Sequence, residues 1–287
     1  MRVLVVSNMY PNEQKPYWGS FVKSCVEGYR ENKVETEIVV LKQSGFFAYL
    51  EFYLSVIKSI LANDYELVHV HYISHSVLPV LLVRVFRKFK IALNFHGSDA
   101  FPESYEGRGR QIVKALISRV AIKISDVVIV PSAYFKERMV SAYKIKKFII
   151  SPSGGVDANL FQFEATGGTS ILFAGRMISE KGALIAARVV KSCGDKCVKA
   201  IFVGEGDDKE AVQSLLSGLE VSYFGMLSRE ELATKMAASD IFLFPSMRKG
   251  ESLGLVLVEA IFSGAVPVVI DNGAVREIIH PSYHEAL

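Results

Sequence analysis

Residues 241–262 read IFLFPSMRKGESLGLVLVEAIF and contain one complete strand–turn–helix unit. IFLFP at 241–245 is a short apolar run, as expected for a strand that is buried on both faces. A glycine-containing loop interrupts the run, and apolar residues at helical spacing then fill 254–263. Such a unit is the building block of a doubly wound α/β sheet, so this segment predicts a parallel sheet.

The same alternation extends over the whole chain. In the first half the predicted strands are 2–7, 36–41, 67–72, 91–95, 127–131 and 148–152, and the predicted helices are 19–32, 46–62, 76–89, 110–124 and 133–143. In the second half the other strands are 170–175, 199–204, 221–225 and 266–270, and the helices are 181–192, 207–217, 228–238, 254–263 and 273–279. Alternating strands and helices predict an α/β fold with parallel sheets.

The chain is long enough for two domains. It has 287 residues, and a domain holds roughly 100–200. Between the two halves, 158–169 loses its periodicity and contains Gly167-Gly168, which is typical of a linker. We therefore predict one doubly wound domain over 1–162 and a second over 163–287.

Composition places the chain among globular proteins. Half of its residues are hydrophobic and 22% are charged, which excludes the class that stays disordered. Cys25, Cys193 and Cys197 cannot form a disulfide framework, and they lack the spacing of a zinc site. A reducing, cytoplasmic setting fits this cysteine usage.

No stretch of the sequence predicts a membrane-spanning helix. The nearest candidate, 46–62, carries Glu51, Ser55, Lys58 and Ser59 on one stripe, so we interpret it as an amphipathic surface helix.

Charge is unevenly distributed along the chain. Residues 1–165 hold 21 Lys/Arg against 15 Asp/Glu, whereas 166–287 hold 12 against 15. The basic first half favours peripheral contact with the inner face of a membrane or with a phosphate-bearing acceptor. Scattered surface lysines explain the excess equally well.

Candidate site residues in the first half follow two of the predicted strands, because open α/β sheets bind ligands at the carboxyl ends of their strands. The loop after 2–7 lacks Gly-x-Gly-x-x-Gly, which argues against a dinucleotide-dependent dehydrogenase. It ends at Gly19, where backbone can approach a ligand and a helix begins. His96 follows 91–95 and is placed to donate a hydrogen bond to a sugar. An ordinary turn and a structural histidine are the alternatives.

Basic residues follow the first strand of the second half. Arg176 comes directly after 170–175, and Lys181 precedes a predicted helix. Arginine binds phosphate oxygens as a fork, lysine as a point charge, and a helix N-terminus adds its dipole. Together they predict a diphosphate site. Gly204 opens a Gly-x-Gly turn after the next strand, which is a weak signal by itself.

Two carboxylates eight residues apart lie on either side of the turn after 241–245. Glu251 lies in the loop, and Glu259 lies on the following helix among apolar residues, where it needs a partner. A carboxylate accepts hydrogen bonds from the vicinal hydroxyls of a sugar, and turn amides bind phosphate. The turn residues are Ser252, Leu253, Gly254 and Leu255.

These motifs together resemble the retaining glycosyltransferases of family 4. Glu251 to Glu259 resembles their Glu-x7-Glu signature, although Leu253 replaces the usual phenylalanine. The resemblance extends over nearly the whole chain, through Tyr10-Pro11, Gly19-Ser20, His96-Gly97, Pro152 to Asp157, Gly175-Arg176, Lys181-Gly182, Val203 to Asp207, Gly264 to Val269, Asn272-Gly273 and Glu277.

The resemblance implies a GT-B fold, with two Rossmann-like domains that face a cleft. It places the acceptor at 1–162 and the nucleotide-sugar donor at 163–287, with the second domain lacking its usual final segment. In the donor domain it assigns Arg176 and Lys181 to the diphosphate, Glu259 to the ribose, and Glu251 with the turn amides to the sugar. In the first domain it places His96 near the reacting centre and Gly19 in the closing loop.

The predicted function is transfer of a hexosyl group from a nucleotide-diphosphate sugar to a glycan, lipid-linked or small-molecule acceptor. The resemblance implies retention of anomeric configuration and no metal, and we expect no cofactor and no nucleic-acid partner. An inactive nucleotide-binding remnant and a sugar-nucleotide epimerase are the alternatives on this fold. A glycoside hydrolase also uses paired carboxylates, but it needs no diphosphate site.

Overall fold

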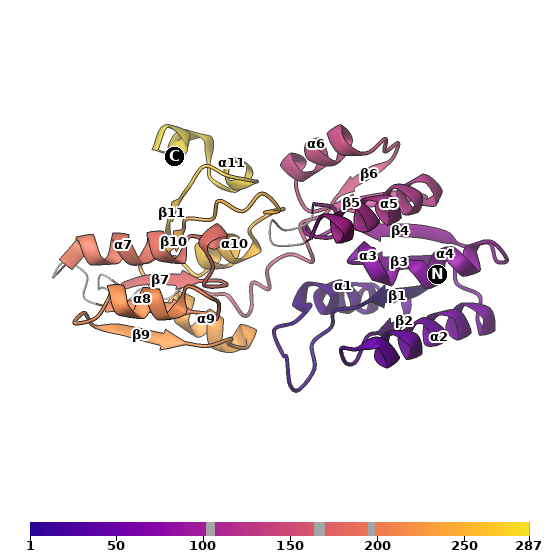
Figure 1. The fold of residues 1–287 in the computed structure, drawn as a ribbon, viewed down its shortest axis with the longest axis horizontal. Helices are drawn as coiled ribbons and strands as arrows, with labels where there is room; N and C mark the ends of the chain where they lie inside the picture. Colours follow the sequence, from indigo (N-terminus) through magenta and orange to yellow (C-terminus); the bar gives the residue numbers. More distant parts are fainter. Residues whose placement is uncertain (102–106, 164–169, 195–198, 287) are drawn as a thin grey trace. The chain divides into compact units, whose positions relative to one another are not determined.

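The computed structural model describes residues 1–101, 107–163, 170–194 and 199–286. It divides into two compact units, Met1–Gly155 and Val156–Leu287 (Figure 1). Each unit contains one parallel sheet with its own helices. The predicted fold class, two Rossmann-like α/β domains, is confirmed.

The first unit is built on six parallel strands in the order β2-β1-β3-β4-β5-β6. The strands are β1 (Arg2–Ser7), β2 (Glu35–Val40), β3 (Leu67–His71), β4 (Lys90–Asn94), β5 (Val127–Val130) and β6 (Phe148–Ile150). The helices are α1 (Ser20–Glu31), α2 (Phe46–Ala62), α3 (Ile73–Ser76), α4 (Leu78–Arg84), α5 (Arg108–Ile124) and α6 (Ala133–Ala142).

Helices cover both faces of β1, which explains its unbroken valine-rich sequence. Leu4 and Val6 lie in the core that α2, α4 and α5 help to form. Val3 and Val5 point to the other face, where α1 packs on them through Val22 and Val26. Every apolar side chain of the strand is therefore buried, as expected for a central parallel strand.

The second unit has five parallel strands in the order β11-β10-β7-β8-β9. They are β7 (Ser170–Ala174), β8 (Lys199–Val203), β9 (Val221–Phe224), β10 (Ile241–Phe244) and β11 (Val266–Val269). The helices are α7 (Ala183–Cys193), α8 (Lys209–Leu215), α9 (Arg229–Ala237), α10 (Leu255–Phe262) and α11 (Val275–Ile278), with 3₁₀ turns at Ser179–Lys181 and Pro281–Ala286. Helices α9 and α10 pack on one face of the sheet, and α7 and α8 pack on the other.

The predicted helix 76–89 is wrong in its bounds, because the structure has two shorter helices here. α3 ends at Ser76, and α4 runs from Leu78 to Arg84. Pro79 lies in the first turn of α4 and has no N–H to donate to the carbonyl four residues earlier. It therefore separates the two helices.

Helix α2 has the predicted bounds, but one of its polar residues is buried. Glu51, Ser55 and Lys58 are exposed, whereas Ser59 faces the core. The Ser59 hydroxyl lies 2.9 Å from the Glu37 carboxylate and 2.7 Å from the Tyr65 hydroxyl. Among the described residues, no helix is long and apolar enough to span a membrane.

The start of the predicted linker is part of the second core. Leu160 and Phe161, together with Val156 just before the predicted linker, pack with β7 and β10 side chains, and Phe161 is only 1% exposed. The units divide between Gly155 and Val156, seven residues before the predicted boundary at 162. Gly167, Gly168 and Cys197 lie outside the described residues.

Candidate active site

Each sheet reverses its strand order at one point, and several of the predicted site residues follow the strands at these points. In the first sheet the reversal lies between β1 and β3, and in the second between β7 and β10. Chain connections leave such neighbouring strands in opposite directions, which opens a crevice at their carboxyl ends. Lys181 follows β7 and Glu251 follows β10, so the second reversal carries both.

Lys181 and Glu251 form a nearly buried ion pair. Lys181 Nζ lies 2.6 Å from Glu251 Oε2, and these side chains are 16% and 8% exposed. The Ser246 hydroxyl donates a 2.8 Å hydrogen bond to the same oxygen. The pair connects two loops that are 70 residues apart in the sequence.

The same two loops are held together by their backbones. Gly182 has φ +72°, and a Cβ there would lie 2.3 Å from the carbonyl oxygen of Pro245. Met247 N donates to Glu180 O at 2.9 Å. Only glycine permits both this left-handed conformation and this approach, so Gly182 positions Lys181 against Glu251.

Glu251 is held as a carboxylate by its surroundings. Burial alone would raise the pKa of Glu251, but the charges of Lys181 and Arg248 and hydrogen bonds from Lys181 and Ser246 outweigh it. Its pKa is therefore below the ordinary value. A charged carboxylate at this edge can accept hydrogen bonds from a polar ligand.

Gly204 supports the loop that carries Arg176. A Cβ at Gly204 would lie 2.0 Å from the carbonyl oxygen of Gly175, and the glycine has φ +134°. Met177 N also donates to Glu205 O at 2.8 Å. The loop after β8 therefore packs against the loop after β7, and the missing side chain of Gly204 permits this close approach.

The turn between β10 and α10 ends without a side-chain cap. Gly254 is the N-cap of α10 with φ +83°, and as a glycine it has no side chain that could accept a hydrogen bond from the helix start. Ser252 and Leu253 before it are buried, and Leu255 is the first helical residue. A helix start without a side-chain cap, close to cations, favours an anionic ligand.

Glu259 finds its partner in Arg229, which sequence reasoning missed. Arg229 at the start of α9 places Nη2 2.6 Å from Glu259 Oε1, and the guanidinium lies over the Phe161 ring. Burial raises the pKa of Glu259 to about 7, and Arg229 limits that rise. The buried carboxylate therefore titrates close to neutral pH.

In the first unit, Gly19 and His96 are linked through α1. Gly19 has φ +76°, and a Cβ there would lie 2.7 Å from the backbone of Met9, so only glycine fits. Two residues later, the Phe21 ring packs on His96 with centroids 4.2 Å apart. The predicted loop glycine and the predicted histidine thus lie near the same end of α1.

His96 is half-buried and is one end of a row of three histidines. Its Nε2 lies 3.1 Å from His71 Nδ1, and the His71 ring lies 4.2 Å from the His69 ring. Burial lowers the pKa of His69 to about 4 and that of His96 to about 3, and it lowers the pKa of His71 well below its ordinary value. All three rings are neutral at physiological pH.

Cys25, His69 and His71 place their ligand atoms within 4.8 Å of one another. One feature disfavours a metal there. The Tyr29 hydroxyl already lies 2.9 Å from His69 Nδ1. We therefore interpret this group as a hydrogen-bonded part of the core.

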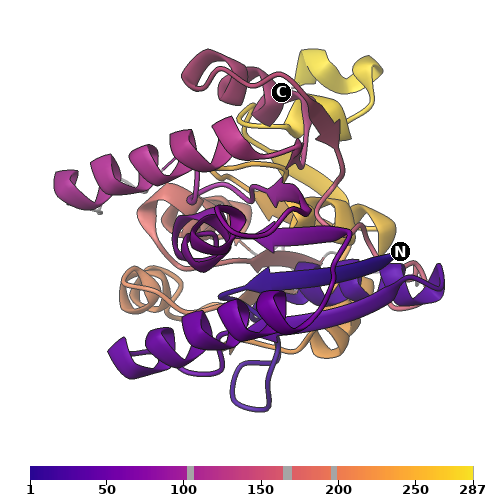
Figure 2. The same cartoon turned by 90° about the vertical axis from the view of Figure 1, so that its right-hand side faces the viewer.

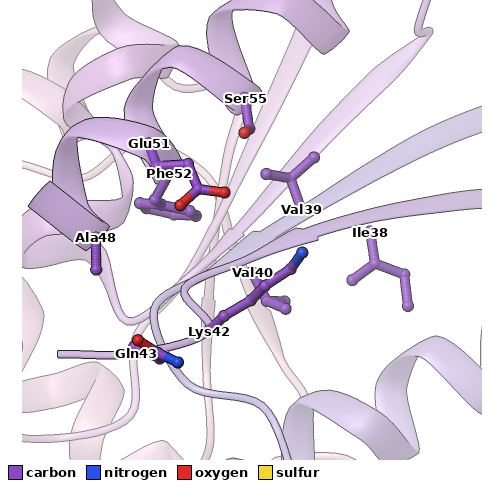
Figure 3. Close-up of a pocket in the computed structure, with 9 residues that line it drawn as sticks. All are labelled: Ile38, Val39, Val40, Lys42, Gln43, Ala48, Glu51, Phe52 and Ser55. Atoms are coloured by element: carbon purple, nitrogen blue, oxygen red, sulfur yellow. The ribbon is translucent and has the colours of Figure 1, made fainter.

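Hollows lie beside the carboxyl ends of β1 and β2. One of about 330 Å³ is lined by Asn8, Lys15, Trp18 and Tyr49. A neighbouring groove of about 380 Å³ lies between β2 and α2, and its lining includes Glu51 and Phe52 from α2 and Lys42 from the segment after β2 (Figure 3). Sequence reasoning identified the loop before Gly19 but not the lining from α2.

The predicted residues fall into two groups, one in each unit. The second unit brings Lys181 together with Glu251, and it packs the Gly204 turn against the loop of Arg176. Glu259 is bound to Arg229 instead.

Two family models match the chain. Residues 2–158 match the model described as Glycosyltransferase Family 4, and residues 168–287 match the model described as Glycosyl transferases group 1.

Individual proteins and solved structures are also similar to this chain. Sulfoquinovosyl transferase SQD2 of Arabidopsis thaliana is 34% identical over 111 residues, which cover 38% of this chain and 21% of that protein. The 2-deoxystreptamine N-acetyl-D-glucosaminyltransferase of Niallia circulans is 24% identical, over 85% of this chain and 67% of that protein. Anabaena HepE, solved in complex with UDP and glucose, shares the fold with a TM-score of 0.72 at 15% identity, covering 98% and 83%. The chain belongs to Glycosyltransferase Family 4, with a group 1 domain as its second part and the GT-B fold class.

Proposed function

We propose that this chain transfers a hexosyl group from a nucleotide-diphosphate sugar to a glycan or lipid-linked acceptor, with retention of anomeric configuration. The observation that carries the proposal is the buried Lys181–Glu251 pair at the strand-order reversal of the second sheet. Nucleotide sugars are cytoplasmic metabolites, so we place the reaction in the cytoplasm, where surface polysaccharide or glycolipid precursors are made.

The leaving diphosphate is bound by positive charge and by a helix start. Lys181 and Arg176 lie in the loop after β7, and the uncapped start of α10 follows β10. Electrostatic groups that are in place before charge develops give the largest single contribution to many reactions. These groups stabilise the nucleoside diphosphate as it departs.

The carboxylates recognise hydroxyls of the donor. Glu251 remains ionised beside Lys181 and contacts the transferred sugar together with the turn amides. Glu259, held by Arg229, accepts hydrogen bonds from the vicinal hydroxyls of the ribose. Before the donor binds, Lys181 orients Glu251. Once the donor is bound, Lys181 binds the donor's diphosphate.

The chemical step requires no protein nucleophile. The bond between the anomeric carbon and the β-phosphate oxygen breaks, and the diphosphate leaves with the electron pair. The acceptor hydroxyl oxygen attacks from the same face, and its proton passes to the departing phosphate oxygen. Configuration is therefore retained, and the cationic side chains replace a metal ion.

The first unit supplies the acceptor side. The Gly19 turn and His96 lie near one end of α1, and the hollow lined by Trp18 and Tyr49 opens by the same loop. Aromatic side chains beside polar groups suit the binding of a sugar. His96 is neutral, so it donates or accepts a hydrogen bond without a change in charge.

The test is turnover with defined donors. The chain is incubated with UDP-, GDP- and ADP-hexoses and acceptor glycans in excess chelator, and the product linkage is assigned by NMR. We expect transfer from one donor class with retention, and at least 100-fold slower transfer by Lys181→Ala. Lys191→Ala on the exposed side of α7 is the matched control. An inverted product, or a strict requirement for a divalent metal, would overturn this mechanism.

A further inference from the structure

Helix α5 carries an apolar stripe that the first unit leaves uncovered. Its inner side buries Ser118, Ala121 and Ile122, whereas large apolar side chains recur every four residues on the outside. Figure 2 shows this helix along the outside of its sheet. The outward residues and their exposed fractions are Ile112 (68%), Leu116 (59%), Val120 (46%) and Ile124 (38%).

The same helix is strongly basic. Its sequence, RGRQIVKALISRVAIKI, contains five Lys/Arg and no Asp or Glu. Four of the five are exposed, namely Arg108, Arg110, Arg119 and Lys123. From 107 to 147 the chain holds ten Lys/Arg against two Asp/Glu, so the positive charge of the first half is concentrated here.

A basic pocket lies at the C-terminal end of this helix. Its volume is about 850 Å³, and its lining includes one carboxylate, Asp126, and five cations. The cations are Arg119, Lys123, Lys144, Lys146 and Lys147. The pocket lies where β5 and β6 begin, at the amino ends of the strands. His96 follows the carboxyl end of β4, so the pocket is separate from the proposed acceptor site.

We propose that the outer face of α5 and this basic pocket form a docking surface for a membrane that contains anionic phospholipid. The apolar stripe inserts at the headgroup–acyl boundary, and the pocket binds a headgroup phosphate. A helix with one apolar face and a basic polar face has the composition of an interfacial helix. The proposal is independent of the transfer reaction, because vesicle binding requires no donor.

The chemistry distinguishes a membrane from other anionic partners. Nucleic acid would be attracted by the cations, but it offers nothing to cover Ile112, Leu116 and Val120. An acidic protein surface would also leave the stripe partly exposed. A lipid surface presents apolar chains and anionic phosphates together along a whole helix, which matches both features of α5.

The experiment is flotation of the full chain with vesicles of phosphatidylcholine alone or with 30% phosphatidylglycerol. We expect binding to the anionic vesicles that weakens as salt is raised. Lys144→Ser with Lys147→Ser should weaken it about 25-fold, because each cation near the surface contributes about fivefold. Ile112→Ser with Leu116→Ser should weaken it at least tenfold by removing inserted apolar area.

Matched controls lie on α2 and near it. Leu50→Ser with Leu54→Ser alters exposed apolar residues of that helix, and Lys42→Ser with Lys58→Ser removes two exposed cations. Both should retain binding within about threefold. All substituted residues are exposed, so the melting temperature should stay within a few degrees. Absence of wild-type binding, equal losses in the α2 controls, or equal binding to neutral vesicles would overturn the proposal.

Discussion

The Arg229–Glu259 pair sets the charge of the carboxylate assigned to the ribose. Burial opposes ionisation of Glu259, and the guanidinium 2.6 Å away favours it. With the pKa of Glu259 near 7, small changes around the carboxylate alter its charge at physiological pH. Arg229 is thus a positioning and charge-setting residue, and no signal in a single sequence connects it with a glutamate 30 residues later.

Removing Arg229 should shift the pH dependence of nucleotide binding to higher pH. In Arg229→Met the pKa of Glu259 rises further, so the carboxyl is protonated at pH 7 and loses its charge-assisted hydrogen bonds. We expect nucleotide affinity at least tenfold below wild type at pH 7, recovering toward wild type at pH 9. Titration calorimetry at the two pH values measures this, with Arg188→Met on the exposed side of α7 as control. An equal loss at both pH values would show that Arg229 acts in another way.

Glu259 also affects stability in a predictable direction. Its folded pKa of about 7 lies above the ordinary 4.5, so the folded chain binds more protons than the unfolded chain between these values. The stabilisation that the raised pKa of Glu259 gives the folded state is fully present below pH 4.5 and is lost as pH rises through 7. From pH 5 to pH 8, wild type should lose about 1–3 kcal/mol of unfolding free energy relative to Glu259→Gln. Urea unfolding at both pH values measures the difference, and parallel pH dependence would contradict the raised pKa.

At the scale of elements, strand–loop–helix units determine where the site residues lie. Strand positions were predictable because β-branched runs buried on both faces have a plain sequence signature, as in β1. The predicted helix bounds were wrong where one proline divides a helical pattern, as at Pro79. Phe161 was assigned to a linker because the residues of its core cluster come from separate elements, β7 and β10, which local periodicity does not reveal.

A substitution at Gly182 tests whether the contact between the loops after β7 and β10 is needed. In Gly182→Ala, the new Cβ meets the Pro245 carbonyl and requires a left-handed backbone, so the loops must separate. We expect about 2–4 kcal/mol of destabilisation and at least tenfold weaker nucleotide binding. Gly28→Ala is the control, because a Cβ on this residue of α1 meets nothing within 4 Å. It should be neutral or stabilising by about 0.5–1 kcal/mol. A stable, binding Gly182→Ala variant would show that the loop contact is unnecessary.

At the scale of the whole molecule, the two units differ in their response to acid. The first unit holds three neutral histidines, of which His69 and His71 are buried and His96 is half-buried. The second carries the predicted donor site, and its buried ionisable pairs are Lys181–Glu251 and Arg229–Glu259 among the residues described. Sequence reasoning singled out His96 in the first half and Lys181, Glu251 and Glu259 in the second, but it could not show which side chains meet.

Acid should destabilise the first unit through its histidines. The folded pKa of His69 is about 4, below the ordinary 6.5, so its contribution is present above pH 6.5 and is lost as pH falls. Between pH 7.5 and pH 5, wild type should lose about 2 kcal/mol more than His69→Leu. Urea unfolding of both proteins at the two pH values, monitored by hydrogen exchange in β1 and β3, measures this difference. Equal losses in the two proteins would mean that His69 is not held neutral.

The central claim is that the loops after β7 and β10 form a nucleoside-diphosphate site. The most direct measurement is titration calorimetry of wild type, Lys181→Ala and Lys191→Ala with UDP, GDP and ADP. We expect wild type to bind one of the three, Lys191→Ala to match it, and Lys181→Ala to bind at least tenfold more weakly. Absence of binding by wild type, or undiminished binding by Lys181→Ala, would contradict the claim.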